Sequence, residues 1–138
     1  MDYNNNSKNQ EYLINRPEFR DLSESAKRIG ILFGHQDKIR TIFFNEFKSF
    51  IFSGAWDNCI YGWKLSNLSM NTLPEISFIG HKDSITSIIP GFTPNMIISS
   101  SKDGTIRFWD ITKQICLNTI EAHHGRIFAL VRGYSPSN

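Results

Sequence analysis

The pattern of hydrophobic and polar residues divides the chain at about residue 29. Residues 1–16 are polar and rich in Asn, a composition typical of a disordered or loosely ordered arm. The stretch 17–28 begins with Pro17, a residue favoured in the first turn of a helix, so it predicts either a short helix or an irregular lead-in. We therefore expect a polar arm over 1–28 and a folded part over 29–138.

The folded part consists of short apolar or alternating runs separated by Gly, Asn, Asp, Ser and Pro. None of these runs sustains the 3.6-residue period of a helix, and short runs at regular spacing are typical of strands. The 11 Phe residues also favour strands. We therefore expect an all-β fold. The predicted strands are Ile29–Phe33, Ile39–Phe44, Phe50–Ser53, Cys59–Lys64, Ile76–Ile79, Ile85–Ile89, Met96–Ser99, Thr105–Trp109, Leu117–Ile120 and Ile127–Val131.

An internal repeat gives these strands an order. Two copies match without a gap at ten positions, which is too many for chance, and they differ in length only after the final Trp, around 67–74. A degenerate third copy begins at Ala122-His123, where Ile127 and Leu130 keep the register. The identical pairs are Gly34 and Gly80, His35 and His81, Asp37 and Asp83, Ile39 and Ile85, Ile42 and Ile88, Ile51 and Ile97, Ser53 and Ser99, Asp57 and Asp103, Ile60 and Ile106, and Trp63 and Trp109.

The second copy resembles the WD-repeat, or beta-transducin, pattern. It runs from Gly80-His81 through a short strand to Ser-Ser-Ser-Lys-Asp-Gly-Thr-Ile-Arg-Phe-Trp-Asp at 99–110, which is nearly the full pattern. The first copy ends in Trp63-Lys64 where the pattern has Trp-Asp, a departure that the family commonly shows. The resemblance covers about residues 29–131 and is specific, because it rests on two copies in register.

The resemblance implies a partial β-propeller with two complete four-stranded antiparallel blades plus flanking single strands. The blades would span 38–79 and 84–120. Residues 29–33 would be the outer strand of a preceding blade, and 126–131 would begin a further blade. Propellers typically close with four to eight blades. Hence we expect a truncated product, a piece of a larger reading frame, or one partner in an assembly that completes the ring.

The resemblance also implies a hydrogen-bonded tetrad in each blade. An indole N–H only donates, a hydroxyl and an imidazole both donate and accept, and a carboxylate accepts, so the four groups can satisfy one another. The turn pairs Asp57-Asn58 and Asp103-Gly104 are of a type that accepts positive φ and would join two strands of a sheet. The expected tetrads are His35, Ser53, Asp57 and Trp63 in the first blade, and His81, Ser99, Asp103 and Trp109 in the second.

Ser, His and Asp together also suggest a hydrolase, and His123-His124 suggests a metal. The trio occurs twice in matching repeat positions, each time with a Trp to occupy the hydroxyl, and no G-x-S-x-G elbow is present. No Cys, His or Asp stands at ligand spacing from the two adjacent His. A structural role is favoured in both cases, so we expect no catalytic residue, no metal and no cofactor.

Trp56 is the main candidate for contact with a partner. It precedes the turn at Asp57, in the position where the second copy has the solvent-facing residue type Lys102. An exposed Trp there would suit an interaction hot spot, whereas the alternative is that it folds onto a neighbouring loop or blade. Basic residues would give the same rim a positive charge that a partner could use. The alternative for each of them is an ordinary solvated surface charge. They are Lys38, Arg40, Lys82, Lys102 and Arg126.

The remaining properties exclude several classes of protein. The formal net charge of +2, without clustered Lys or Arg, does not favour nucleic acid. No apolar run approaches the ~18 residues of a membrane span, and the N-terminus lacks the features of a signal peptide. Cys59 and Cys116 form no CxxC motif, so buried reduced thiols are favoured over a disulfide or a metal site. A cytoplasmic location is expected, with the nucleus as the alternative.

These observations favour a non-catalytic scaffold or recruitment module that binds proteins or peptides. A fold does not name its partner, and a complementing propeller chain or a second copy is also a candidate. The alternative is a regulatory WD-repeat domain split from a larger multidomain protein, for example an adaptor in vesicle traffic or ubiquitin transfer.

Overall fold

The structure is a computed structural model that describes residues 30–69 and 71–133. Short strands joined by turns account for nearly all its regular structure, which confirms the all-β prediction. The arm expected over 1–28 lies outside the described residues. The elements are β1 (Ile39–Asn45), β2 (Phe50–Ala55), β3 (Ile60–Lys64), the short 3-10 helix η1 (Leu65–Asn67), β4 (Ile76–Phe78), β5 (Ile85–Pro90), β6 (Met96–Ser101), β7 (Thr105–Asp110) and β8 (Ile115–Glu121).

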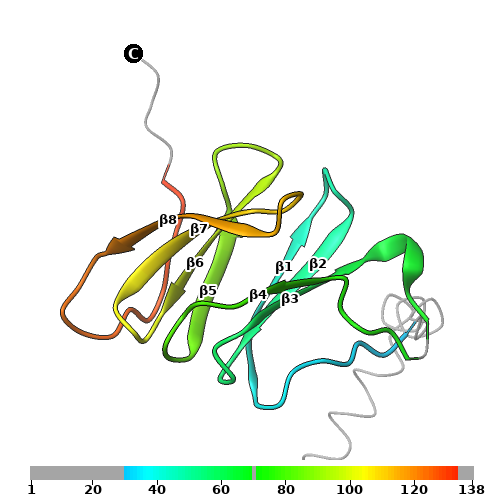
Figure 1. The fold of residues 1–138 in the computed structure, drawn as a ribbon, viewed down its shortest axis with the longest axis horizontal. Coiled ribbons are helices and arrows are strands. Elements are labelled where there is room, and N and C mark those ends of the chain that lie inside the picture. Colours follow the sequence, from blue (N-terminus) through cyan, green and yellow to red (C-terminus); the bar gives the residue numbers. More distant parts are fainter. Residues whose placement is uncertain (1–29, 70, 134–138) are drawn as a thin grey trace, which may run out of the picture.

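The strands form two four-stranded sheets, which lie side by side in Figure 1. One has the order β1-β2-β3-β4 and the other β5-β6-β7-β8, and every neighbouring pair is antiparallel. The pairing register repeats as well. Ile39 faces Ala55 in the first sheet and Ile85 faces Ser101 in the second, each just before an irregularity in the ladder. The two complete antiparallel blades predicted from the sequence are thus confirmed.

The turn residues adopt the conformation that the sequence predicts. Asn58, between β2 and β3, has φ 67°, and Gly104, between β6 and β7, has φ 83°. Asn and Gly are the residues that enter this left-handed region at least cost. The equivalent turns of both repeats therefore contain a residue with left-handed φ at the same position.

The core lies between the two sheets. Phe52 on β2 and Ile85 on β5 are both fully buried there. Gly54 allows the close approach of the sheets, because an added Cβ at this position would lie 2.4 Å from the Cγ2 of Ile85. Each large apolar side chain buried here contributes about 1.5–3 kcal/mol, so this interface holds the two blades together. The buried cluster is Phe52, Ile60, Ile76, Phe78, Ile85, Ile88, Ile97, Trp109 and Ile111.

The segments that flank the two sheets are less regular than the strands within them. Before β1, Leu32 forms an isolated parallel bridge with Thr72. The strand expected at Ile29–Phe33 is reduced, over residues 30–33, to this one bridge. The strand expected at Ile127–Val131 is not formed, although the backbone N–H of Ile127, after β8, donates to the carbonyl of Ser101 at 3.3 Å. A ladder needs a partner strand along its length, and these segments have isolated contacts only. The assignment of 126–131 to a further blade stays a prediction.

Candidate functional site

The second repeat contains a continuous chain of hydrogen bonds from its core to its rim. The Trp109 indole N–H donates to Ser99 Oγ at 2.8 Å. His81 Nε2 lies 2.8 Å from the same hydroxyl, and His81 Nδ1 lies 2.9 Å from Asp103 Oδ2. If the neutral imidazole carries its proton on Nδ1, every donor in the chain meets an acceptor. The four groups thereby join two strands, the β6–β7 turn and the loop before β5.

Asp103 is the most heavily hydrogen-bonded member of this chain. Besides His81, it accepts bonds from the backbone N–H and the hydroxyl of Thr105 and from the backbone N–H of Lys82. Burial alone would raise the pKa of Asp103, but these bonds, that from the Thr105 hydroxyl first, lower it to about 2. Burial lowers the pKa of His81 although Asp103 opposes this effect. The pair therefore consists of an ionised carboxylate and a neutral imidazole near pH 7.

The first repeat forms the same chain with one link missing. His35 Nε2 lies 2.8 Å from Ser53 Oγ, and His35 Nδ1 lies 2.9 Å from Asp57 Oδ2. The indole N–H of Trp63 is buried but has no hydrogen-bond partner among the described residues. Its ring still lies 6.2 Å from the His35 ring, against 6.1 Å for the equivalent pair. The indole thus has nearly the same position in both repeats.

The carboxylate of the first repeat also has fewer donors. Cys59 stands where the second repeat has Thr105, so Asp57 accepts only the backbone N–H there, at 3.1 Å. Burial would raise the pKa of Asp57, but bonds from the backbone of Gln36, from His35 and from Cys59 lower it below 3.8. The first tetrad is therefore the less completely hydrogen-bonded of the two.

The incomplete tetrad lies on an open face of the first sheet. Side chains alternate between the faces of a strand, so Ile51 and Ser53 lie opposite to Phe52 and Gly54, which face the second sheet. A hollow of about 220 Å³ follows this open face. It is lined by Leu32, Phe33, Gly34, His35, Asp37, Ile39, Ile42, Ile51, Ser53 and Trp63.

The Ser, His and Asp trios have little access to solvent. Ser99 is 0% exposed and Ser53 is 3% exposed. The Ser99 hydroxyl is also occupied by two partners within 2.8 Å, the indole and the imidazole. A nucleophilic hydroxyl must reach a substrate carbonyl, and the buried Ser99 hydroxyl already has two partners. The geometry suits a network that orders loops.

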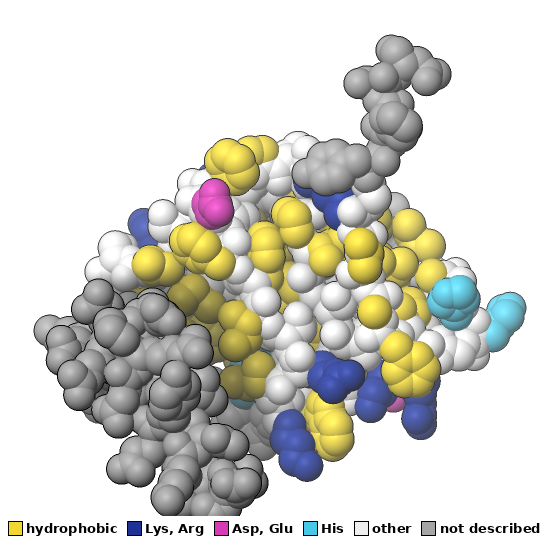
Figure 2. All heavy atoms as spheres, turned by 180° about the vertical axis from the view of Figure 1, so that it is seen from behind, with side chains coloured by type: hydrophobic (Ala, Val, Ile, Leu, Met, Phe, Trp, Pro, Cys, Tyr) yellow, Lys and Arg dark blue, Asp and Glu magenta, His cyan; other side chains and the backbone are white. Residues whose placement is uncertain are grey.

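The rim residues predicted from the sequence are partly brought together. Trp56, at the end of β2, is 41% exposed, and its ring lies 4.9 Å from Lys38 Nζ and 5.0 Å from Lys102 Nζ. Lys102 belongs to the second blade, so this cluster spans the junction of the two sheets. Figure 2 shows Lys and Arg side chains gathered with hydrophobic ones along the lower edge of the molecule. Arg40 and Lys82 are exposed as well, but among the described residues the cations that lie over the Trp56 ring are Lys38 and Lys102.

The other polar candidates lie apart. His123 and His124 are both exposed after β8, and residues 30–69 and 71–133 contain no group of three potential metal ligands. Cys59 and Cys116 are free thiols, each partly buried. No helix in the described ranges has the length and apolar character to cross a membrane.

Sequence reasoning missed Arg107, which lies over the Trp109 ring at 5.9 Å. Its position in the repeat corresponds to Tyr61, since both residues face the tetrad Ser across the ladder, Ser99 and Ser53 respectively. The sequence could have drawn attention to this position, because the first copy has Tyr61 where the second has Arg107.

Two four-stranded antiparallel blades, each with its own His, Ser and Asp network, define a propeller-type repeat protein. The chain belongs to the WD-repeat family, because the family pattern described as "WD domain, G-beta repeat" matches residues 26–64 and 73–110. This result confirms the resemblance noted in the sequence.

Individual relatives have varied names. The chain is 30% identical over 115 residues to the "CCR4-associated factor 4 homolog" of Candida glabrata, a match that covers 79% of this chain and 19% of that protein. It is 30% identical over 104 residues to the "DDB1- and CUL4-associated factor 11 homolog" of Caenorhabditis briggsae, covering 74% and 19% respectively. The chain thus spans about a fifth of the length of these relatives.

A solved structure with a similar fold is the C-terminal WD40 domain of Sif2. The TM-score is 0.66 at 26% sequence identity, and the match covers 77% of this chain and 29% of that one.

Proposed function

We propose that this chain is a non-catalytic module that binds proteins or peptides through the rim formed by its β2–β3 and β6–β7 turns. The observation that carries the proposal is the cluster of Lys38, Trp56 and Lys102. A Trp that is 41% exposed beside two ammonium groups offers a large apolar surface and positive charge at one place. Trp is enriched among the residues that dominate binding energies at interfaces.

The charge of this cluster is available to a partner. No carboxylate lies within ion-pair distance of Lys38 or Lys102 in the described part of the chain, where the ion pairs are the two His–Asp contacts. Cation–π contacts at exposed sites contribute only about 0.5–1 kcal/mol, so the lysines can move to meet a ligand. An apolar side chain flanked by acidic groups would suit this surface.

The test compares Trp56→Ala with Phe47→Ala in the full chain. Phe47 is 79% exposed in the β1–β2 turn, at the opposite edge of the same sheet, and is therefore a matched exposed aromatic. Partners captured by the wild-type chain should be retained by Phe47→Ala and lost with Trp56→Ala, while the melting curves of both variants stay close to that of the wild type. If Trp56→Ala unfolds the chain, Trp56 is part of the core and the proposal is wrong.

A regulatory domain of a larger protein is the second candidate. The support is that the chain spans only 19% of each of two relatives, one of which is named as associated with DDB1 and CUL4. Sequence adjoining this chain that carries further Gly-His and Trp-Asp repeats would favour it. A cytoplasmic or nuclear location is proposed for either role. Steep salt dependence of binding would instead indicate nucleic acid, for which the net charge of +2 gives little support.

A further inference from the structure

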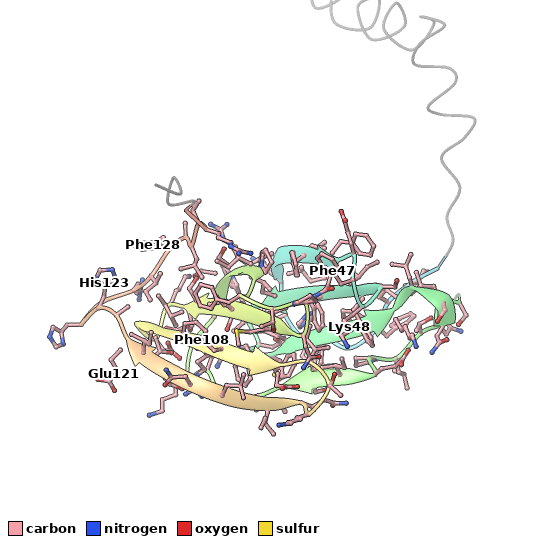
Figure 3. All side chains as sticks on the ribbon, turned by 90° about the horizontal axis from the view of Figure 1, so that it is seen from above. Phe47, Lys48, Phe108, Glu121, His123 and Phe128 are labelled. Carbon is pink, nitrogen blue, oxygen red and sulfur yellow. The ribbon has the colours of Figure 1, made fainter. Side chains whose placement is uncertain are left out.

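A polar hollow of about 420 Å³ opens beside the second tetrad. It lies between the β6–β7 turn, the end of β8 and the loop that follows β8. Figure 3 shows Glu121 and His123 at this end of the molecule, well away from Lys48. The polar side chains that line it include Lys82, Thr105, Arg107, Thr119, Glu121 and His123.

Arg107 is the unusual member of this lining. Its side chain makes no hydrogen bond and no ion pair with any described residue, and its Nε is buried without a partner. The guanidinium instead lies beside Gly80 and over the Trp109 ring. An added Cβ at Gly80 would lie 2.7 Å from Arg107 Nη1. A guanidinium stays charged and carries five N–H donors in a fixed plane, so this one is held in place with its donors unused.

Two carboxylates share the hollow with Arg107, but neither forms an ion pair with it among the described residues. Asp103 also lines the hollow, but its two oxygens already accept four bonds, from Thr105, His81 and Lys82. Glu121 is exposed and forms no ion pair among the described residues. The lining therefore carries two cationic side chains, Arg107 and Lys82, and two carboxylates, Asp103 and Glu121. Among the described residues, the Arg107 guanidinium stands out because no side chain or backbone carbonyl accepts a hydrogen bond from it.

The first repeat shows that this charge is not needed to cover the Gly-His pair. There, Tyr61 occupies the equivalent position, and its ring lies 4.6 Å from the His35 ring. An added Cβ at Gly34 would lie 3.1 Å from the Tyr61 ring, so the phenol covers the same place. A neutral side chain thus fulfils the packing role, and the positive charge of Arg107 calls for a separate explanation.

We propose that this hollow binds an oxyanion carried by a peptide, either a carboxylate of Asp or Glu or a phosphate. The guanidinium fork pairs with two oxygens of such a group, and Lys82 adds a second charge. The site is separate from the Lys38, Trp56 and Lys102 cluster, so it goes beyond the proposed function and is tested independently. A charged partner at Arg107 also provides an acceptor for donors that the chain itself leaves unpaired.

The experiment is a titration of the full chain followed by NMR, with the indole N–H signal of Trp109 as the reporter. Two blocked tripeptides are the probes, one with Glu and one with phosphoserine between two Gly residues. The Trp109 signal should shift and saturate with at least one probe, and the tighter probe identifies the source of the oxyanion. If neither probe produces a saturable shift, the proposal is overturned.

The key variant is Arg107→Tyr, which installs the side chain of the first repeat and removes both the charge and the guanidinium donors. We expect about tenfold weaker binding, as for the loss of a charge-assisted hydrogen bond. Glu121→Gln should strengthen binding by removing a nearby negative charge. Wild-type affinity in Arg107→Tyr would overturn the proposal. Should that variant fail to fold, Lys82→Gln retains the backbone bond to Asp103 and must itself weaken binding severalfold.

Two controls separate this site from the others. Lys48→Gln removes the same charge at a distant turn and should bind both probes as the wild type does. Trp56→Ala should also leave the titration unchanged, because its ring belongs to the other cluster. Loss of binding in Trp56→Ala would mean that the probes occupy the rim cluster, and would overturn the assignment to Arg107.

Discussion

Ile42 and Ile88 occupy the same position of the two repeats, yet Ile42 is 69% exposed and Ile88 is 5% exposed. The difference arises because the first sheet covers the face that carries Ile88, whereas no sheet among the described residues covers the face that carries Ile42. An apolar face that one repeat buries is therefore open in the other.

This open face predicts self-association. Exposed apolar patches of more than a few hundred Å² favour contact with other chains. We expect the purified chain to form dimers or larger species, measured by size-exclusion chromatography with light scattering. Ile42→Asp should shift the mass towards the monomer, whereas Phe47→Asp, at a residue 79% exposed in the β1–β2 turn, should not. A monodisperse monomer with one sharp unfolding transition would contradict the prediction.

The two tetrads should differ in their response to loss of the indole N–H. Trp109→Phe removes the bond to Ser99, at 2.8 Å, and should lower the free energy of unfolding by about 1–3 kcal/mol beyond the effect of the smaller ring. Trp63→Phe removes an N–H that has no acceptor among the described residues, so it should lower the free energy of unfolding by less. Denaturant melts measure both values, and equal losses would show that the Trp63 bond forms in solution.

Removing larger parts of the second tetrad should cost more. Trp109→Ala should lower the free energy of unfolding by about 2–4 kcal/mol, because a large buried aromatic is lost. His81→Ala should also be destabilising, since it leaves Ser99 and Asp103 without their shared partner. Wild-type stability in both variants, again by denaturant melts, would rule out a structural role for the tetrad.

The close approach of the two sheets at Gly54 should be sensitive to a single methyl group. Gly54→Ala would place Cβ 2.4 Å from the Cγ2 of Ile85, so the interface must shift, at a cost of about 1–3 kcal/mol. Gly125→Ala is the matched control, because an added Cβ there meets nothing within 4 Å. Thermal melts of both variants make the comparison. Equal melting temperatures for Gly54→Ala and Gly125→Ala would show that the two sheets do not pack closely at Gly54.

Stability should fall with decreasing pH in two windows. The pKa of folded His81 lies below 6.5, so the unfolded chain takes up a proton first and stability is lost as the pH falls below 6.5. The pKa of folded Asp103 is about 2 against 3.8, so its contribution is present above 3.8 and is lost as the pH falls towards 2. Urea denaturation across both windows measures this. His81→Gln should flatten the upper one, and an unchanged slope would contradict the assignment.

Local pattern was sufficient to predict the eight strands of the two sheets, whereas their arrangement in blades and the tetrad residues followed from the family resemblance. Alternation, β-branched and aromatic residues and turn chemistry act within a few positions, so they are visible in any single segment. The positive φ at Asn58 and Gly104 is an example, because it follows from the turn sequence alone. The repeat added the register, since ten gapless identities require equivalent pairing in both sheets.

Tertiary structure alone decided which of the repeated positions are covered and which charges remain unpaired. The sequence could not separate Ile42 from Ile88, because burial depends on which sheet lies against which face. It could not place Lys102 against Trp56, because the two residues come from different blades. The sequence marked Arg107 only by the change from Tyr61 in the first repeat, and it could not show that the guanidinium has no partner among the described residues. The absence of a partner for that guanidinium depends on the positions of Gly80, Trp109 and the loop after β8 in space, which no local pattern records.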